Sequence, residues 1–185
     1  MASDGWFDHK TLTTIEDTWK NLDYPPSKLH RPELLEEERE ILELYKGWAH
    51  CMNEEFNASI EPGRKFYNFP EVVTFDIFGF TGRGDFKAHF DETFHYFSKS
   101  TFQIKNLEVF ATSKTTGYAT MYQRLIGGTA EDGKAFEMTY RITGILEKID
   151  GKWQWVHEHV SFPTIMSSMK SDPTCSVKPQ DAFQF

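Results

Sequence analysis

Residues Asp150 to Pro163 read DGKWQWVHEHVSFP, and this stretch decides both the fold and the candidate chemistry. An Asp-Gly pair followed by strict alternation predicts a tight hairpin turn and then a long strand, whose side chains point in turn to opposite faces. One face carries Trp153, Trp155, His157, His159 and Ser161. The other carries Gln154, Val156, Glu158, Val160 and Phe162. The face that meets the interior determines which of these side chains can do chemistry.

Two turn geometries lead to opposite placements of these faces. With a two-residue type I′ loop, Ile149 pairs with Lys152, and the Trp/His face joins the apolar side of the preceding strand. With a three-residue loop and a G1 bulge, Lys148 pairs with Lys152, and Glu158 joins that apolar side instead. We favour the second register because it separates apolar from polar side chains more cleanly. It places Glu158 in an apolar cavity and makes the Trp/His face a convex surface suited to subunit contact.

The composition is that of one globular domain. Of 185 residues, 39% are hydrophobic and 26% are charged, and no apolar run approaches the length of a membrane span. The net charge of -8 disfavours binding to nucleic acids and to anionic membranes. Cys51 and Cys175 form no cluster that would predict a disulfide framework or a zinc site. We therefore expect a cytoplasmic protein with no bound metal.

Aromatic residues are unusually frequent, at 16% of the chain. Because aromatic rings bury large apolar areas and pack edge to face, this excess favours either an aromatic core or a pocket for a flat apolar ligand.

The remaining sequence predicts an N-terminal arm at 1–32, a domain at 33–163 and a C-terminal tail at 164–185. Prolines in the arm argue against a helix starting at Thr14. A helix from Glu33 has a periodic apolar face made of Ile41, Tyr45, Trp48, Met52 and Phe56, opposite an acidic face that we expect to be solvated. A strand at 72–80 and a second helix capped by Asp85 follow. Further strands are expected at 102–112, 118–127 and 134–148. This order predicts an α+β domain with helices packed on a strongly curved antiparallel sheet.

This order of elements, with the motif GKWxxVHxHxS at 151–161 and the R-x-T of Arg141 and Thr143, resembles the SnoaL-like branch of the NTF2-like, ketosteroid-isomerase-like superfamily. The resemblance covers roughly 34–163 and implies a cone-shaped fold. The closing motif is also similar to the association domain of calcium/calmodulin-dependent kinases, which shares that fold. The superfamily includes isomerases, dehydratases, cyclases, other lyases, epoxide hydrolases, carriers and assembly domains, so the resemblance implies a fold more narrowly than a function.

The resemblance implies roles for two residues. Asp76 falls where ketosteroid isomerases keep a proton-shuttling aspartate, and Tyr45 is placed similarly to the tyrosine that donates to the oxyanion. The second oxyanion acid of those isomerases has no counterpart, and Gln103 and Ala119 stand near the positions of the dehydratase histidines. The positions of the association domain's cavity arginines hold Gln123, Gly144 and Val160. The missing oxyanion acid argues against a ketosteroid isomerase, and the missing arginines argue against a carboxylate ligand and against the hub role of the association domain.

We expect the catalytic residues to be Asp76, His89, Glu158 and Tyr45. Each has a simpler interpretation: Asp76 could bind backbone amides of the glycine-rich loop, Glu158 could pair with a cation of the arm, and His89 could be a core histidine. In an apolar cavity, desolvation would raise the pKa of Glu158 toward the range useful for acid/base catalysis. The expected substrate-binding residues are Trp48, Phe78, Gln123 and Tyr140.

Together these features predict a cofactor-independent lyase, acting by elimination, dehydration or retro-aldol-type cleavage, or an isomerase. It would move protons on a hydrophobic aromatic or polycyclic molecule, for which the resemblance implies a lignin-derived diaryl compound, a polyketide or a steroid. The alternative is a non-catalytic ligand-binding or oligomerisation domain, whose cavity would be filled by its own side chains. We expect a homodimer or higher homo-oligomer and no nucleic-acid or membrane partner.

Overall fold

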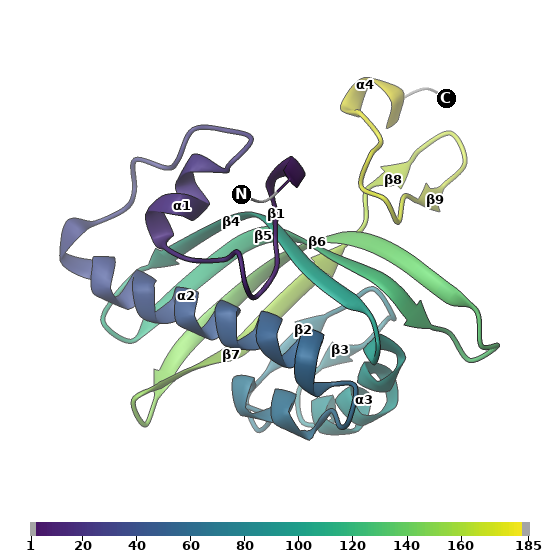
Figure 1. The fold of residues 1–185 in the computed structure, drawn as a ribbon, viewed down its shortest axis with the longest axis horizontal. Helices are drawn as coiled ribbons and strands as arrows, with labels where there is room; N and C mark the ends of the chain where they lie inside the picture. The colour runs from purple at the N-terminus through teal and green to yellow at the C-terminus, as the bar shows by residue number, and fades with distance from the viewer. Residues whose placement is uncertain (1–2, 183–185) are drawn as a thin grey trace.

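The computed structural model describes residues 3–182, which fold as a curved sheet with helices packed against it (Figure 1). Within these residues, seven strands have the order β1-β4-β5-β6-β7-β2-β3 and pair antiparallel, except that β2 and β7 are parallel. The strands are β1 (Trp6–Phe7), β2 (Val73–Phe75), β3 (Thr81–Gly82), β4 (Thr101–Ala111), β5 (Thr116–Thr129), β6 (Ala135–Ile149) and β7 (Lys152–Ser161). A second small sheet pairs β8 (Thr164–Ile165) with β9 (Lys170–Ser171).

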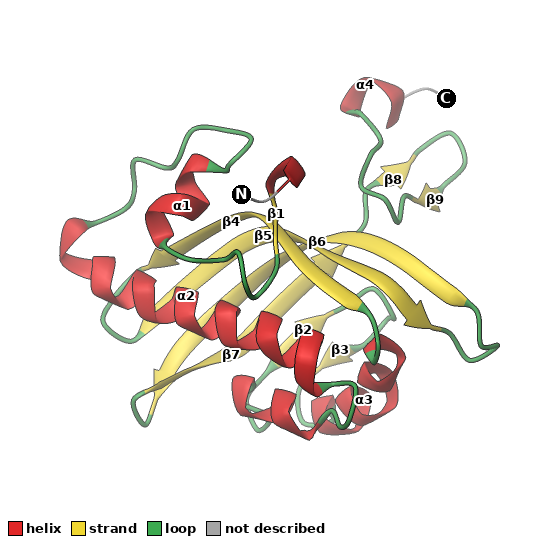
Figure 2. Cartoon of the chain, in the orientation of Figure 1, coloured by secondary structure: helices red, strands yellow, loops and turns green. Residues whose placement is uncertain are grey.

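The described part of the chain contains the helices α1 (Ile15–Lys20), α2 (Leu35–His50), α3 (Phe86–Thr93) and α4 (Pro179–Ala182). Figure 2 shows α2 lying across one face of the sheet, with α3 near β2 and β3. Short 3₁₀ turns at Ser3–Gly5, Pro32–Leu34, Glu61–Phe66 and Phe94–Phe97 and a π-helical turn at Cys51–Glu55 complete the helical structure of these residues. The predicted α+β class, with helices on a curved and mostly antiparallel sheet, is confirmed. The boundaries of the arm and tail stay predictions, and their outermost residues, 1–2 and 183–185, lie outside the described residues.

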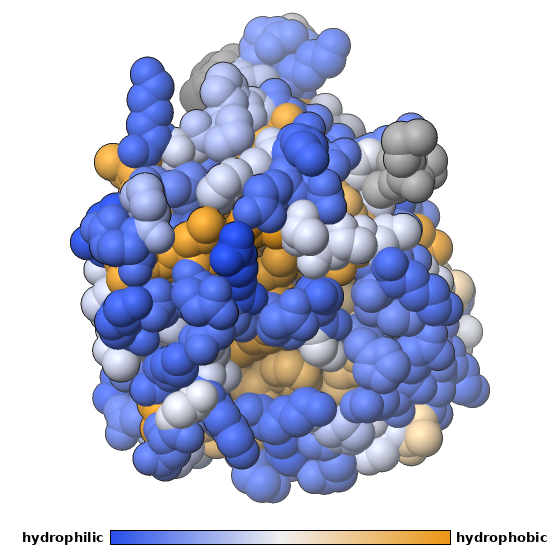
Figure 3. Space-filling model, turned by 60° about the vertical axis from the view of Figure 1, so that its left-hand side comes forward, coloured by the Kyte–Doolittle hydropathy of each residue, from blue (hydrophilic) through white to orange (hydrophobic). Residues whose placement is uncertain are grey.

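The apolar face of α2 forms the centre of the core. The predicted periodic residues Ile41, Tyr45, Trp48, Met52 and Phe56 are all buried. Trp48 makes edge-to-face contacts with five aromatic rings: Phe56, Phe66, Tyr67, Phe94 and Trp155. The surface is more hydrophilic than this core: hydrophilic residues cover most of the face in Figure 3, and hydrophobic residues gather in patches and in a hollow. The aromatic excess of the sequence therefore forms a packed core, as expected.

The acidic face of α2 is only partly solvated, which corrects the sequence-based expectation. Glu38 is 1% exposed, and its carboxylate lies 3.0 Å from Nδ1 of His30. The other ring nitrogen of His30 lies 3.3 Å from Glu108 on β4. His30 also stacks on Phe110, with ring centroids 4.6 Å apart. The imidazole of the arm thus bridges two carboxylates of the domain and ties the arm to the sheet.

The arm is also more regular than its prolines indicated. Helix α1 begins directly after Thr14, whose hydroxyl oxygen accepts a hydrogen bond from the amide of Asp17. The helix ends at Lys20, before the prolines, so the predicted absence of a helix here is wrong.

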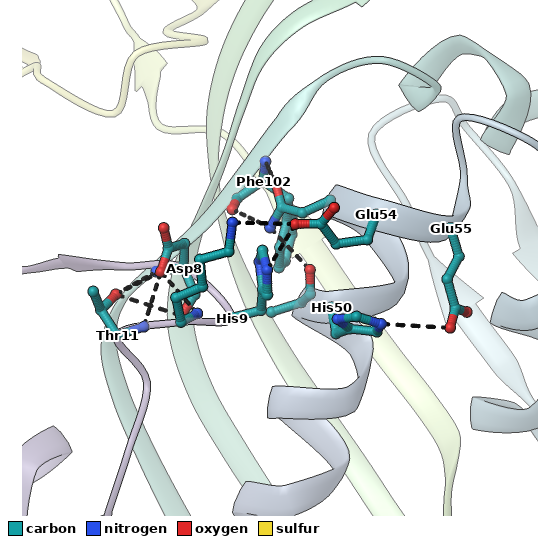
Figure 4. A network of polar contacts seen from close by, with 10 residues as sticks. Asp8, His9, Thr11, His50, Glu54, Glu55 and Phe102 are labelled. Atoms are coloured by element: carbon teal, nitrogen blue, oxygen red, sulfur yellow. Dashed lines mark hydrogen bonds and ion pairs between the residues drawn. The ribbon is translucent and has the colours of Figure 1, made fainter.

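A second contact, shown in Figure 4, fixes the arm to the C-terminal end of α2. His9 Nε2 lies 2.9 Å from Glu54, and the rings of His9 and His50 meet edge to face. His50 in turn lies 3.6 Å from Glu55. The arm is therefore held at both ends of α2.

The β6–β7 hairpin combines features of both predicted registers. Ile149 pairs with Lys152, and Asp150 and Gly151 have φ values of 49° and 75°, so the turn has two residues and the favoured three-residue loop is wrong. A β-bulge then follows at Val156, because Leu146 pairs with Trp155 whereas Ile145 pairs with His157. The extra residue turns every later side chain of β7 to the other face.

The bulge divides the predicted Trp/His face into two. Trp153 and Trp155, before the bulge, are buried against α2, so their predicted place on a convex surface is wrong. Glu158, after the bulge, is buried on that same inner face, as the favoured register predicted. His157 and His159 lie on the outer face, where His159 pairs with Thr143. Gly144 stands opposite Glu158, and a side chain there would meet the Tyr45 hydroxyl at 2.9 Å and the Trp155 indole nitrogen at 3.0 Å.

Candidate active site

A cavity lies between the inner face of the sheet, α2 and α3. Its volume is about 60 Å³, enough for roughly four to six water molecules at about 10–15 Å³ each. Apolar and aromatic side chains make up most of its wall, with a few polar groups among them. The lining residues are Trp48, Met52, Tyr67, Thr74, Asp76, Ile77, Phe78, Phe86, His89, Thr93, Phe94, Phe97, Gln123, Met138, Tyr140, Ile142, Glu158 and Val160.

Asp76 and His89 meet at one side of this cavity, where Oδ2 of the carboxylate contacts Nε2 of the imidazole. The predicted strand at 72–80 is interrupted here, because β2 ends at Phe75 and the chain turns. The other carboxylate oxygen of Asp76 accepts the amides of Phe78 at 2.9 Å and Phe80 at 2.8 Å, which forms the turn. The Phe80 ring stacks on the imidazole of His89, with centroids 4.5 Å apart. Both members of the pair are therefore fixed from a second side.

His89 reaches this position from α3. Asp85 precedes the helix as predicted, but its side chain makes no capping hydrogen bond. Phe86 and Phe90 are buried and anchor the helix, which leaves His89 facing the turn that holds Asp76.

Glu158 enters the cavity from β7 because the bulge at Val156 turns it inward. Burial raises the pKa of its carboxyl group to about 8, hydrogen bonding by the Tyr67 hydroxyl opposes this shift, and the nearby Asp76 carboxylate adds to it. Glu158 is therefore protonated at neutral pH and can act as an acid. No cation of the arm is needed to accommodate it.

Residues 65–165, which contain Asp76, His89 and Glu158, match the family model of the SnoaL-like domain. The chain belongs to this SnoaL-like domain family. Solved structures agree with the fold: an NTF2-like protein of unknown function from Pseudomonas putida has a TM-score of 0.59 and 23% identity, over 78% of this chain and 97% of that one. The predicted NTF2-like cone is confirmed.

Two further solved structures share the fold of this SnoaL-like domain. An NTF2-like superfamily protein from Salmonella enterica has a TM-score of 0.55 and 19% identity, over 67% of this chain and 89% of that one. A putative calcium/calmodulin dependent protein kinase II association domain from Xanthomonas campestris has a TM-score of 0.52 and 18% identity, over 66% and 85%. No relative was found among curated protein sequences. At these identities the comparisons establish the fold alone.

The predicted substrate-binding residues Trp48, Phe78, Gln123 and Tyr140 all line the cavity of this SnoaL-like domain. Tyr140 donates a hydrogen bond to Gln123 Oε1 at 2.9 Å, and burial raises its pKa. Because that proton is engaged, the Tyr140 oxygen is presented to a ligand as an acceptor.

Tyr45 lies behind the cavity wall rather than in it. Its hydroxyl oxygen accepts the indole N–H of Trp155 at 3.2 Å, and Trp155 is itself fully buried. The structure therefore brings Asp76, His89 and Glu158 together at one cavity and leaves Tyr45 in the core behind it.

Sequence reasoning missed three polar groups of the cavity, Thr74, Thr93 and Tyr67. Thr74 is 1% exposed, lines the cavity, and its hydroxyl has no hydrogen-bond partner among the described residues. Its position two residues before Asp76 within the predicted strand at 72–80 was the available signal, since alternate strand residues share a face. Tyr67 reaches Glu158 through tertiary packing alone, and no local pattern indicated it.

Residues 3–182 contain neither a metal-binding cluster nor a membrane-spanning helix. Within residues 3–182, no three His, Cys, Asp or Glu side chains are grouped so that they could hold a metal ion. No helix in this same range has the length and apolar character needed to cross a membrane.

We predict that Glu158→Gln changes how stability depends on pH. Between the ordinary carboxyl pKa of 4.5 and about 8, only the folded wild-type chain holds a proton at Glu158, so its stability falls as the pH rises through this window. The wild-type protein loses about 1.4 kcal/mol of unfolding free energy for each unit by which the pKa is raised, and so several kcal/mol across the window. The variant, which has no ionisable group at this position, does not lose this stability. Urea unfolding from about pH 5 to about pH 9 measures the difference. Parallel pH profiles for the two proteins would contradict the assignment.

Proposed function

We propose that this SnoaL-like domain is a cofactor-independent lyase or isomerase that transfers protons on a hydrophobic aromatic or polycyclic molecule. The observation that carries the proposal is the meeting of the Asp76–His89 pair and a protonated Glu158 at one apolar cavity. A base and an acid with opposite protonation states at one pH are what acid/base catalysis requires. Apolar walls support the choice of a hydrophobic substrate.

His89 is the base of this proposal. Asp76 takes the Nε2 side of its ring, so a neutral imidazole carries its proton on Nε2 and presents Nδ1 as the acceptor. The two amides that hold Asp76 and the Phe80 ring that stacks on His89 fix this orientation. Asp76 is thus the group that orients the imidazole and stabilises it when it becomes charged.

Glu158 is the acid, and Thr74 supplies a donor for developing negative charge. In an elimination, His89 takes a proton from a carbon next to an electron-withdrawing group, and Glu158 gives one to the leaving oxygen. In an isomerisation, the proton returns to a different carbon. A buried hydroxyl without a partner can donate to an oxyanion at no cost of breaking another bond, which favours Thr74 over Tyr45 for this role.

We predict that the protein accelerates the ring opening of nitrobenzisoxazole, a flat neutral probe. A base removes one carbon-bound proton, and the electron pair of that carbon–hydrogen bond completes a nitrile. The nitrogen–oxygen bond breaks at the same time and leaves its electron pair on oxygen as a phenolate, which is followed by absorbance. His89→Ala and Asp76→Asn are each expected to lower the rate by about 100-fold, the typical contribution of a positioned base. Glu158→Gln is expected to have a smaller effect, because a nitrophenolate needs little help in leaving.

His50→Ala is the matched control, since it removes a half-exposed imidazole outside the cavity. It should retain the wild-type rate. Wild-type turnover no faster than that of buffer, or full turnover in both His89→Ala and Asp76→Asn, would contradict the proposal.

We also propose that the protein forms a homodimer through the outer face of the sheet. Phe75 on β2 is 44% exposed there, and its ring meets His157 and His159 edge to face. Ile145 on β6 is 43% exposed and pairs with His157. An association domain among the structural neighbours supports self-assembly of this fold, although the open cavity favours the enzyme over a purely assembling protein.

Light scattering is expected to give the mass of a dimer for the wild-type protein. Phe75→Asp should shift it to a monomer, because burying an unpaired carboxylate in an apolar contact is unfavourable. Leu29→Asp, which places the same charge on an exposed leucine of the arm, is the control and should stay dimeric. A monomeric wild-type protein, or equal behaviour of the two variants, would contradict the proposed interface.

A further inference from the structure

A larger groove adjoins the cavity on its outer side. Its volume is about 760 Å³, and it shares three residues with the cavity, Ile77, Phe78 and Met138. Phe78 is 53% exposed and stands where the two spaces join. The other lining residues are Tyr96, Ala130, Glu131, Asp132, Phe136, Glu137, Phe162 and Pro173. The cavity that contains His89 and the groove are therefore neighbours that share part of their apolar wall.

Several separate segments build this groove, among them the β5–β6 hairpin, the tail, the turn after β2 and the Phe94–Phe97 turn. The β5–β6 hairpin supplies Phe136, whose ring lies against Gly128 of the paired strand. The tail supplies Pro173, whose carbonyl accepts the amide of Thr139 on β6 at 2.7 Å. Asp172 holds the tail in this position by accepting the hydroxyl of Thr174 and several amides of the following residues. Burial opposes the effect of these hydrogen bonds, which together lower the pKa of Asp172 to about 2. The turn after β2 supplies Ile77 and Phe78.

The charges along these two spaces have one sign. Glu131, Asp132 and Glu137 border the groove and Asp76 lines the cavity, whereas Glu158 in the cavity wall is protonated at neutral pH and adds no charge. Among the described residues that line either space, none is a lysine or an arginine. Lys134 pairs with Asp132 from outside the lining of either space. An anionic group in the groove would still meet the carboxylates of Glu131 and Glu137 without a cation in the lining, which costs free energy of both desolvation and repulsion.

We infer that the substrate is an elongated molecule of two parts without a negative charge, whose reacting end occupies the cavity and whose apolar extension occupies the groove. The inference rests on the proposed function and adds to it the substrate's length and charge. It excludes carboxylate- and phosphate-bearing compounds and admits neutral or cationic ones. The cavity, at about 60 Å³, has no room for a second ring, because a cavity that binds one benzene molecule has a volume of about 150 Å³, so the groove is what provides room for the second part.

Four probes separate these features: phenol, para-hydroxybibenzyl, and the same bibenzyl with either a carboxylate or an aminomethyl group on its distal ring. Isothermal titration calorimetry is expected to show that the bibenzyl binds at least about tenfold more tightly than phenol, because a second ring is buried. The distal carboxylate should remove this gain, and the distal aminomethyl group should keep it.

Glu137→Lys tests the charge of the groove. In this variant the carboxylate probe should gain about tenfold in affinity relative to phenol, because a cation replaces a carboxylate beside the distal ring. Glu147→Lys reverses the same charge on the same strand, at an exposed position outside both spaces, and is the matched control. Its affinities should equal those of the wild-type protein. Phe136→Ala should weaken the bibenzyl relative to phenol.

Several results would overturn the inference. Equal affinities for phenol and the bibenzyl, absence of binding by all four probes, or equal behaviour of Glu137→Lys and Glu147→Lys would each do so. Ring opening of nitrobenzisoxazole distinguishes failure of the groove assignment from failure of the proposed function. If that reaction depends on His89 while the second ring adds no affinity, the groove assignment alone fails. If the reaction is also absent, the proposed function fails with it.

Discussion

The β-bulge at Val156 is the constraint on which the rest of the structure depends. Strand side chains alternate, so without an extra residue Trp155 and Glu158 could not face the same side of the sheet. With the bulge, β7 buries Trp155 against α2 in its first half and directs Glu158 into the cavity in its second half. One inserted residue therefore lets a single strand serve both the core and the candidate active site.

The aromatic core makes this arrangement rigid. Trp155 contacts Trp48 and Tyr67, with ring centroids 5.2 Å and 4.9 Å apart, and its indole N–H reaches Tyr45. Each such ring pair contributes about 0.5–1.5 kcal/mol beyond burial. Tyr67 belongs to this cluster and also bonds to Glu158, so the packing that stabilises the domain positions the acid as well. Gly144, opposite Glu158, provides the space that these rings occupy.

The fold was largely predictable because its signals are local. The apolar period of α2 identified Ile41, Tyr45 and Trp48 as core residues, and all three are buried. Alternation located the long strands, and the closing motif indicated the family. The bulge was not predictable, because the hydrogen bonding that it disrupts and the burial that it allows depend on how β7 packs against β6 and α2. The favoured register placed the bulge in the turn, whereas the structure has it at Val156. Either bulge exchanges the faces of the later β7 residues, so the predicted inner face of Glu158 was correct although the predicted turn was wrong.

The candidate site was predictable in part. Asp76 was expected from the resemblance, His89 from its place beside two phenylalanines, and Glu158 from the partition of faces. The contact between Asp76 and His89 depends on the turn after β2. The sequence did not indicate this turn, because the strand was predicted to continue to residue 80. Tyr45 has its expected place on the core face of α2, but its hydroxyl bonds to Trp155 and it does not line the cavity. Thr74 was overlooked because a hydroxyl becomes informative only when burial leaves it without a partner.

The central claim is that the bulge places Glu158 where its carboxyl group stays protonated at neutral pH. Carbon-13 NMR of the glutamate carboxyl groups tests it directly, with the Glu158 signal assigned by its loss in Glu158→Gln. The account predicts a titration midpoint of about 8 for this signal. A midpoint near 4.5, the ordinary value for glutamate, would contradict it.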